Sequence, residues 1–316
     1  MRRVLQMIAV AAMSLPTAAS EIANGVDFIP GEFVPGRQPD GNSILFHTNA
    51  GLVVMDTGRH AEHTQKILDA ARDAHQPIVA VINSHWHLDH IGGNPRVRAA
   101  YPNVHVYASD ALFDAQKGFL ANYRRQLEEV IGQTADGQQK ESYRDEIARI
   151  DAGAQLAPDR VVKQQQALRI GTRNLQLHLQ KNSVTAGDIW VFDAATRTLA
   201  AGDLVTLPVP FFDTACPAHW KTALDDLWHA DFKQLVPGHG APMSREQFAV
   251  YRGAFDHLLA CAASDAPKAQ CIEGWITDSG ALLPESQHAA AKSMLDYYLD
   301  SSLRGDAKTN AALCGT

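Results

Sequence analysis

The sequence predicts an α/β fold in which strands and helices form layers, followed by a helical C-terminal extension. Two observations lead to this prediction. Short apolar runs of strand length alternate with segments whose apolar residues recur at helical spacing, as in mixed α/β proteins. No repeat of twenty to fifty residues and no Pro- or Ser-rich linker divides the 316 residues. We therefore expect one α/β domain over residues 21–260 and the helical extension over residues 261–316.

The composition agrees with a globular protein and excludes several other classes. Hydrophobic residues make up 46% of the chain and charged residues 20%, which allows a large buried core and excludes a disordered or fibrous protein. The 28 Lys and Arg residues are outnumbered by 35 Asp and Glu residues, so the formal net charge is -7. Because no basic excess is available to bind phosphate backbones, we expect no nucleic-acid partner.

The first twenty residues have the pattern of a secretory signal peptide. Arg2 and Arg3 precede an apolar run over residues 4–15, and small residues follow at Ala18 to Ser20. The apolar run is too short to span a bilayer as a stable anchor. The sequence thus predicts a signal peptide over residues 1–20 and a periplasmic or secreted protein without a membrane anchor.

A β-hairpin is predicted next. Residues 43–47 and 52–56 are apolar-rich runs separated by the turn-forming sequence Thr-Asn-Ala-Gly. Residues 60–75 have helical spacing, and the continuous apolar run Ile78–Ile82 predicts a buried strand. Further strands are predicted at residues 104–108, 161–162, 175–179, 189–192 and 198–201, and further helices at 111–131, 142–150, 221–229, 245–263 and 284–302.

All four cysteines lie in the last third of the chain, at positions 216, 261, 271 and 314. An even number of cysteines in an exported protein favours structural disulfides. Of the three pairings, the short separation of Cys261 from Cys271 favours that pair, with Cys216 and Cys314 as the other; four buried thiols are the alternative. No CxxC spacing occurs, which excludes a zinc ribbon or a thioredoxin-type motif.

A histidine-rich motif follows the predicted buried strand directly. Residues 85–90 read His-Trp-His-Leu-Asp-His. Three imidazoles and a carboxylate on a turn at the C-terminal end of a strand are what a metal site in an α/β protein needs. His85 and His87 alternate and so point to the same side of an extended segment, whereas Asp89 and His90 lie on the bend beyond. The four side chains therefore suit two neighbouring metal ions.

At these residues the chain resembles the metallo-β-lactamase superfamily of zinc hydrolases, whose signature is HxHxDH. The resemblance covers roughly residues 26–260. Three further segments match in the expected order: Val-Val-Met-Asp-Thr-Gly at 53–58, Ala-Gly-Asp-Leu-Val at 201–205 and Val-Pro-Gly-His-Gly at 236–240. The resemblance implies an αββα sandwich with the site on loops at one edge of the two packed sheets.

The resemblance also implies the site residues and the cofactor. Asp56 supports the metal site from behind its ligands, Asp203 bridges two metal ions, and His239 completes the second site. The implied cofactor is Zn²⁺, one or two ions per chain, with iron as the alternative metal. The implied ligands are His85, His87, Asp89, His90, Asp203 and His239.

One position departs from the family pattern. The family carries the third histidine of its first metal site in a GHTxGD segment, and here Val184 occupies that position in Ser-Val-Thr-Ala-Gly-Asp at 183–188. Because valine cannot coordinate zinc, three interpretations stay open: two metals with an unusual first site, one metal in the second site, or a replacement ligand from elsewhere. His178 and His219 are the nearest histidines in sequence.

Within the superfamily, residues 199–217 together with the export signal resemble the quinoprotein-relay (SoxH-related) zinc metallohydrolases. These are exported proteins associated with dehydrogenases that use pyrroloquinoline quinone. The resemblance implies a periplasmic quinoprotein as a partner and does not identify a substrate.

Two functional hypotheses follow. In the first, the protein is a zinc-dependent hydrolase whose metal-bound hydroxide attacks an ester, thioester or lactam-like bond of a small molecule. Asp89 and Asp203 are then catalytic as well as ligands. Residues 207–212 with Trp220 either line an apolar substrate pocket near the metals or belong to the core. In the second, it is a non-catalytic or weakly catalytic metal-binding accessory protein on the same fold. A serine hydrolase has no support, because no GxSxG occurs and Ser84 is better interpreted as a loop residue that holds the motif.

Overall fold

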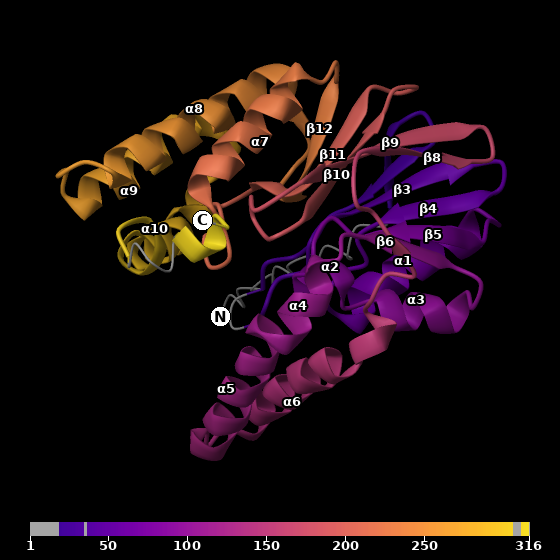
Figure 1. Cartoon of the computed structure of the whole chain (residues 1–316), viewed down its shortest axis with the longest axis horizontal. Coiled ribbons are helices and arrows are strands. Elements are labelled where there is room, and N and C mark those ends of the chain that lie inside the picture. The colour runs from indigo at the N-terminus through magenta and orange to yellow at the C-terminus, as the bar shows by residue number, and fades with distance from the viewer. Residues whose placement is uncertain (1–18, 35–36, 306–310, 316) are drawn as a thin grey trace, which may run out of the picture.

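The computed structural model describes residues 19–34, 37–305 and 311–315. Two β-sheets pack face to face, and helices cover both outer faces (Figure 1). The first sheet contains, in spatial order, Ser20–Ala23 (β1), Val26–Ile29 (β2), Ser43–Thr48 (β3), Gly51–Met55 (β4), Ile78–Ile82 (β5), His105–Ala108 (β6) and Arg160–Val161 (β7). The second contains Met243–Ser244 (β13), Gln234–His239 (β12), Thr198–Thr206 (β11), Asp188–Asp193 (β10), Arg173–Gln180 (β9) and Gln166–Ile170 (β8).

A hydrophobic layer fills the space between the sheets. Val53 and Ile82 of the first sheet pack in one buried cluster with Leu177 and Val191 of the second. All five residues of β4 are buried, because an apolar strand between two covered faces has no solvent side. The predicted αββα sandwich is therefore confirmed.

Two helices that cover the first sheet are Ala61–Asp73 (α1) and Asn94–Ala100 (α3). The short helix Leu88–Ile91 (α2) lies between them in the sequence. Ile67 and Val97 anchor α1 and α3 to the sheet through a second buried cluster. Pro217–His229 (α7) and Arg245–Ala262 (α8) cover the second sheet (Figure 1). Ser244 begins α8 with a capping box, in which its side chain accepts from the Gln247 backbone N–H and Gln247 reaches back to the Ser244 N–H.

A helical insertion projects from the first sheet between β6 and β7 (Figure 1). It comprises Ala111–Lys117 (α4), Phe119–Gln133 (α5) and Gly137–Asp151 (α6), followed by the 3-10 turn Gly153–Gln155. The single helix predicted over residues 111–131 is wrong in one respect, because Gly118 leaves the helical conformation and separates α4 from α5.

The C-terminal region is helical, as predicted, and packs on the second sheet. Its helices are α8, Lys268–Ser279 (α9) and Glu285–Tyr298 (α10), with a 3-10 turn at Gly280–Leu282 and a π-helical turn at Leu299–Leu303. The sequence analysis did not predict α9, whose buried face is short and is completed by packing against α8 and α10. The boundary at residue 260 lies in the last turn of α8 and remains a prediction.

The strands that the sequence analysis missed are short, lie at a sheet edge or contain turn-forming residues. β1 and β2 are four residues long, β13 is two residues long, and β8 alternates poorly, with one buried residue in five. β12 contains Pro237 and Gly238, which normally argue against a strand. The register of β3 with β4, with Ile44 opposite Met55, confirms the predicted hairpin.

Residues 1–18 of the predicted signal peptide lie outside the described residues, and Ser20 already begins β1. The cleavage site and the exported location therefore remain predictions. Within the described ranges, none of the helices combines the length and the apolar character that a membrane crossing requires.

The four cysteines form two close pairs, and these are the two pairs that the sequence analysis favoured. Cys216 is joined to Cys314 across a sequence separation of 98, and Cys261 is joined to Cys271 across 10. No cysteine within the described part of the chain is free. The first bond ties the C-terminal segment to the loop that precedes α7.

The substitution Cys314→Ser is expected to lower the free energy of unfolding of the oxidised protein by about 5 kcal/mol, and Cys271→Ser is expected to lower it by about 3 kcal/mol. The effect of Cys314→Ser is larger because the disulfide to Cys216 closes the longer loop and so restricts the unfolded chain more. Urea unfolding of both variants and of the wild type tests this, with reduced wild-type protein as the control. If Cys314→Ser unfolds at the same urea concentration as the oxidised wild type, the long-range disulfide does not form.

Candidate metal centre

The six predicted ligands meet at one edge of the sandwich, where strands from both sheets end. β4 and β5 run parallel in the first sheet, as do β11 and β12 in the second. The motif of residues 85–90 follows β5, Asp203 lies within β11, and His239 is the last residue of β12. Carboxyl ends of parallel strands commonly form binding sites, and here two such ends face each other.

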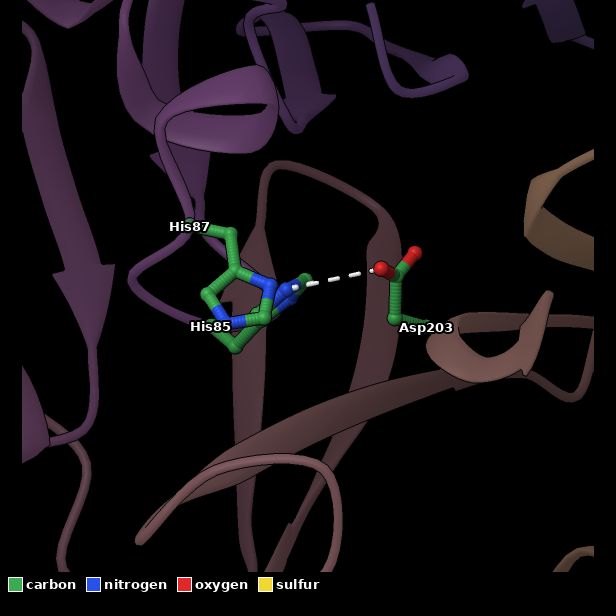
Figure 2. Close-up of side chains that lie close together, drawn as sticks. All are labelled: His85, His87 and Asp203. Atoms are coloured by element: carbon green, nitrogen blue, oxygen red, sulfur yellow. Dashed lines mark ion pairs between the residues drawn. The ribbon is translucent and has the colours of Figure 1, made fainter. Parts of the chain in front are cut away.

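The first group of ligands comprises His85, His87 and Asp203. One ligand atom from each lies within 4.8 Å of the others. His85 Nε2 is 3.7 Å from Asp203 Oδ2. Figure 2 shows the two imidazoles and the carboxylate turned toward one another. His85 and Asp203 are buried, and His87 is partly exposed, so this group is the one that opens toward solvent.

The second group comprises Asp89, His90 and His239, all buried and again with ligand atoms within 4.8 Å of one another. Asp89 Oδ2 is 3.0 Å from His239 Nε2 and 3.7 Å from His90 Nε2. Asp203 reaches this group too, because its Oδ1 is 3.1 Å from His90 Nε2. The two oxygens of Asp203 thus face different groups, which is the geometry of a bridging carboxylate.

Several buried polar atoms at this centre have no hydrogen-bond partner within the described part of the chain. Such atoms are rare in folded proteins, since each one loses its interaction with water. The atoms are His85 Nε2, His90 Nε2, both carboxylate oxygens of Asp203 and both ring nitrogens of His239. His239 Nε2 and the atoms of His85, His90 and Asp203 converge, and they are nitrogen and oxygen donors of the kind that Zn²⁺ binds.

The electrostatics of the centre also favour a cation. Burial by itself would lower the pKa of His90, but the carboxylates of Asp203, Asp56 and Asp89 outweigh it and raise the pKa well above the usual range. Burial lowers the pKa of His85, with His90 and His87 acting in the same direction. The negative charge that favours a proton on His90 also favours a metal ion in its place.

Asp56 holds the motif from behind, as the resemblance implied. Its Oδ1 accepts from the Ser84 backbone N–H at 2.7 Å, and its Oδ2 accepts from Ser84 Oγ at 2.7 Å and lies 2.8 Å from His90 Nδ1. These contacts leave His90 Nε2 pointing at Asp203. Ser84 Oγ also lies 2.9 Å from His85 Nδ1, which confirms Ser84 as a residue that holds the motif.

Close packing of backbone around Asp203 requires glycine at position 238. A Cβ atom on Gly238 would lie 2.0 Å from Asp203 Oδ1 and 2.7 Å from the Gly202 backbone. Any other residue would displace the Asp203 carboxylate.

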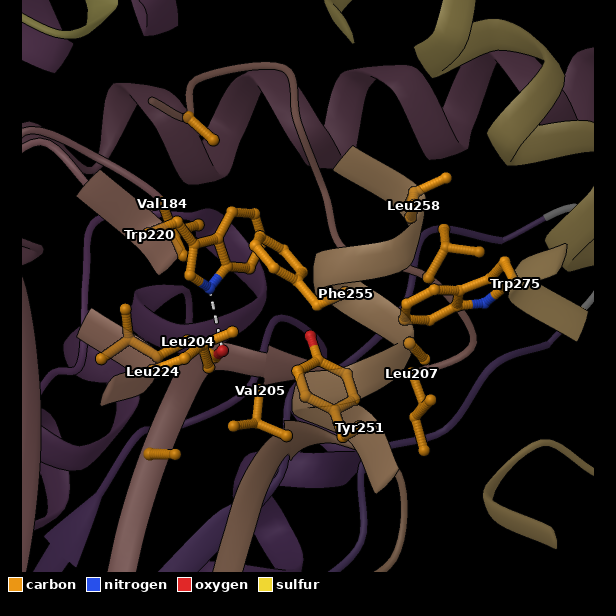
Figure 3. Close-up of a cluster of buried hydrophobic side chains, with 14 of the residues drawn as sticks. Val184, Leu204, Val205, Leu207, Trp220, Leu224, Tyr251, Phe255, Leu258 and Trp275 are labelled. Carbon is orange, nitrogen blue, oxygen red and sulfur yellow. Dashed lines mark hydrogen bonds between the residues drawn. The ribbon is translucent and has the colours of Figure 1, made fainter. Parts of the chain in front are cut away.

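Val184 is wholly buried and belongs to the hydrophobic cluster that includes Leu204 and Trp220 (Figure 3). Neither histidine considered as a replacement joins the first group. His178 stacks on Trp190, with ring centroids 3.7 Å apart, and His219 is exposed on α7. The first group therefore has two histidines and one carboxylate.

Thr214 connects His87 to the loop that carries Val184, and the sequence analysis missed it. Thr214 Oγ1 donates to the Val184 carbonyl oxygen at 2.9 Å and lies 3.0 Å from His87 Nε2. Because the single hydroxyl proton goes to the carbonyl, the hydroxyl oxygen accepts from the Nε2–H of His87. This leaves His87 Nδ1, which Figure 2 shows turned toward His85, as the nitrogen available to a metal.

Arg59 is a second residue that the sequence analysis missed. It is buried, contacts Glu146 of α6 through Nη1, and lies 3.4 Å from Asp89 Oδ1 through Nη2. Burial alone would lower the pKa of Arg59, but Glu146 and Asp89 raise it. Arg149 lies 2.6 Å from the other oxygen of Glu146. This network connects the helical insertion to a predicted metal ligand.

A cavity of about 420 Å³ opens beside His87 and Asp89. Only Phe211 of the predicted apolar pocket lines it, because Leu207, Val209, Phe212 and Trp220 belong to the hydrophobic core. For Trp220 and most of residues 207–212, the interpretation as core is therefore confirmed and the interpretation as pocket is wrong. The walls come instead from the loop before β3, the helical insertion and α10.

Comparison with known proteins supports this description. The family model of the metallo-beta-lactamase superfamily matches residues 36–240. A linear primary-alkylsulfatase from Pseudomonas sp. (strain ATCC 19151) is 25% identical over 218 residues, which cover 61% of this chain and 40% of that protein. A hydroxyacylglutathione hydrolase from Synechococcus sp. (strain JA-3-3Ab) is 40% identical over 47 residues, which cover 15% of this chain and 19% of that protein. The matches thus span less than half the length of either relative.

Solved structures share the fold. A metallo-beta-lactamase from Pontibacter korlensis has a TM-score of 0.56 at 19% identity, covering 75% of this chain and 98% of that one. The structure of TMB-1 has a TM-score of 0.54 at 16% identity, covering 75% of this chain and 96% of that one.

Proposed function

The chain belongs to the metallo-beta-lactamase superfamily, and on that premise we propose that it is a metal-dependent hydrolase of a small ester, thioester or lactam-like substrate. The observation that supports this most strongly is the convergence of six His and Asp side chains, four of which carry buried nitrogen or oxygen atoms without a hydrogen-bond partner among the described residues. Hydrolase names among the curated relatives agree with the reaction class.

His85, His87 and Asp203 would hold one zinc ion, and Asp89, His90 and His239 the other, with Asp203 shared. When bound, zinc lowers the pKa of a coordinated water and polarises the bond to be cleaved. Asp89 and Asp203 orient the attacking water as hydrogen-bond acceptors. Although burial opposes it, His90 lowers the pKa of both carboxylates, so each remains ionised and able to accept.

The missing third histidine supports a second candidate function. A first site with two histidines and one carboxylate has the minimum of three protein ligands that a catalytic zinc uses. A weakened site of this kind suits a metal-binding accessory protein with little turnover. Export to the periplasm and association with a quinoprotein belong to this proposal, and they rest on the N-terminal pattern and on the resemblance of residues 199–217.

Elemental mass spectrometry of protein purified without added metal or chelator, followed by assays on ester, thioester and lactam panels, tests both candidates. Two zinc equivalents with turnover support the two-metal hydrolase. One equivalent with turnover means that a single site suffices. Bound metal without turnover on any panel favours the accessory protein, and no metal uptake refutes both.

Replacing Thr214 by Val is expected to raise the dissociation constant for zinc at the first site about tenfold or more, because hydrogen bonds behind metal ligands typically contribute 10- to 100-fold to affinity. Valine keeps the shape of the side chain but leaves the His87 tautomer unfixed. Zinc competition with a chromophoric chelator measures the change. Thr214→Ser restores the hydroxyl and serves as the matched control; equal affinities in the two variants would contradict the role of the hydroxyl.

A further inference from the structure

The cavity beside the metal centre is built in part by the C-terminal extension. His87 and Asp89 line it on one element, and Met294 and Tyr298 of α10 line it on another. A substrate held at the candidate metal ligands would extend into this cavity, whose wall is formed in part by α10. The chemistry of this wall indicates what kind of substrate group it binds.

Aromatic rings surround the approach to the metal centre. The rings of Phe33 and Phe211 lie 5.3 and 5.5 Å from the His239 ring, and Trp86 lies 4.6 Å from His87. Phe119 lies 5.2 Å from Trp86. Phe33 and Phe119 are 44% and 45% exposed, although large apolar side chains are normally covered. Exposed aromatic faces around a concave site favour a ligand with an apolar surface.

The positive side chains of this cavity already have acidic partners. Arg59 contacts Glu146 and lies beside Asp89, and Arg37 Nη2 is 3.0 Å from Glu62 Oε2. A carboxylate or sulfate on a substrate would therefore meet guanidinium groups whose charge is already offset by acidic side chains.

Asp213 is the lining carboxylate that has no cationic partner among the described residues. Its Oδ2 accepts from the hydroxyl of Tyr298 at 3.1 Å, and its Oδ1 accepts from that of Tyr297 at 3.3 Å. Burial raises the pKa of Tyr298, and Asp213 raises it further, so the phenol stays protonated and donates. Phenol donors fix the position of the carboxylate and leave its negative charge uncompensated.

We propose that the cavity wall formed by Asp213 and by Tyr298 of α10 binds a cationic group of the substrate that has an apolar surface, such as an alkylated ammonium. Asp213 and Tyr298 are the residues that determine this specificity. An ammonium carrying carbon substituents is attracted by aromatic ring faces and by a nearby carboxylate. The inference rests on the proposed hydrolase function, since it assumes that the scissile bond lies at the metal ions.

Three thiols of similar size test the proposal by binding alone. The thiolate of each probe coordinates zinc. The group at the other end of the probe contacts the wall formed by Asp213 and Tyr298, so the differences in affinity measure the preference of that wall for charge. The probes are 2-(trimethylammonio)ethanethiol, its uncharged counterpart 3,3-dimethylbutane-1-thiol, and the anionic 4-mercaptobutanoate. Isothermal titration of the zinc-loaded protein is expected to give about tenfold tighter binding of the cation than of the uncharged probe, with the anion weakest.

The variants Asp213→Asn and Tyr298→Phe are expected to reduce the ratio of cationic to uncharged affinity, with Asp213→Asn bringing it close to one. A folding defect would weaken all three thiols alike and would leave the ratio unchanged. Asp73→Asn, at an exposed position on α1, is the control and should keep the wild-type ratio.

Equal or tighter binding of the uncharged or anionic thiol to the wild type overturns this inference and leaves the hydrolase proposal intact. An unchanged affinity ratio in Asp213→Asn also overturns it. Failure of the protein to take up zinc, or of every thiol to bind the zinc-loaded protein, refutes the metal site and this inference together.

Discussion

Replacing Asp203 with asparagine is expected to lower kcat/KM about a thousandfold and to remove at least one metal equivalent. Asparagine keeps the shape of the side chain, but it removes the charge and leaves one oxygen where two are needed for the two groups. Loss of several kcal/mol of transition-state stabilisation by a metal corresponds to about three powers of ten in rate. Metal content and turnover of a panel substrate are measured on the same preparation.

The control for this substitution is Asp231→Asn, at an exposed carboxylate that pairs with Arg197 on the surface. It should leave metal content and rate unchanged. Circular dichroism establishes that Asp203→Asn is folded, so that a loss of metal is not a loss of structure. Full metal content and more than a tenth of the wild-type rate in Asp203→Asn would show that this carboxylate does not bridge two metals.

The sequence predicted the parts of the fold and site that have local signatures. β5 matches the predicted buried strand because a continuous apolar run between turn residues has few alternative conformations. His85 to His90 form a local cluster, so their type and spacing indicate a metal site without knowledge of the fold. Asp203 and His239 are distant in sequence, and only the family resemblance connected them with the motif.

The remaining site residues depend on tertiary packing, which no local pattern reports. Thr214 and Asp213 lie in the loop between β11 and α7, and the sequence analysis predicted neither as a site residue. Tyr298 reaches the cavity because α10 packs against α9 and brings the Tyr298 hydroxyl to Asp213, and Arg59 is significant only because Glu146 of the helical insertion lies beside it. Arg59 directly follows the Asp-Thr-Gly segment that the resemblance connects with the site, and this adjacency was the one available signal for it.

Asp56→Asn is expected to destabilise the metal-free protein by about 3 kcal/mol and to weaken zinc binding 10- to 100-fold. Asp56 accepts from three buried donors, two on Ser84 and one on His90. An amide has one acceptor oxygen, and its NH₂ group faces donors that it cannot satisfy, so at least one buried group loses its partner. Zinc affinity falls because His90 is no longer held with Nε2 toward Asp203.

Asparagine is the informative replacement here because Asp56 has a φ of 60°, a left-handed conformation that asparagine tolerates and alanine does not. The effect of the carboxylate is thus separated from backbone strain. Urea unfolding without metal measures stability, and chelator competition measures affinity. Asp69→Asn, on the exposed face of α1, should change stability by less than about 0.5 kcal/mol. If Asp56→Asn loses zinc affinity without losing stability, Asp56 acts on ligand orientation alone; if it loses neither, the hydrogen bonds behind the ligands do not control this metal centre.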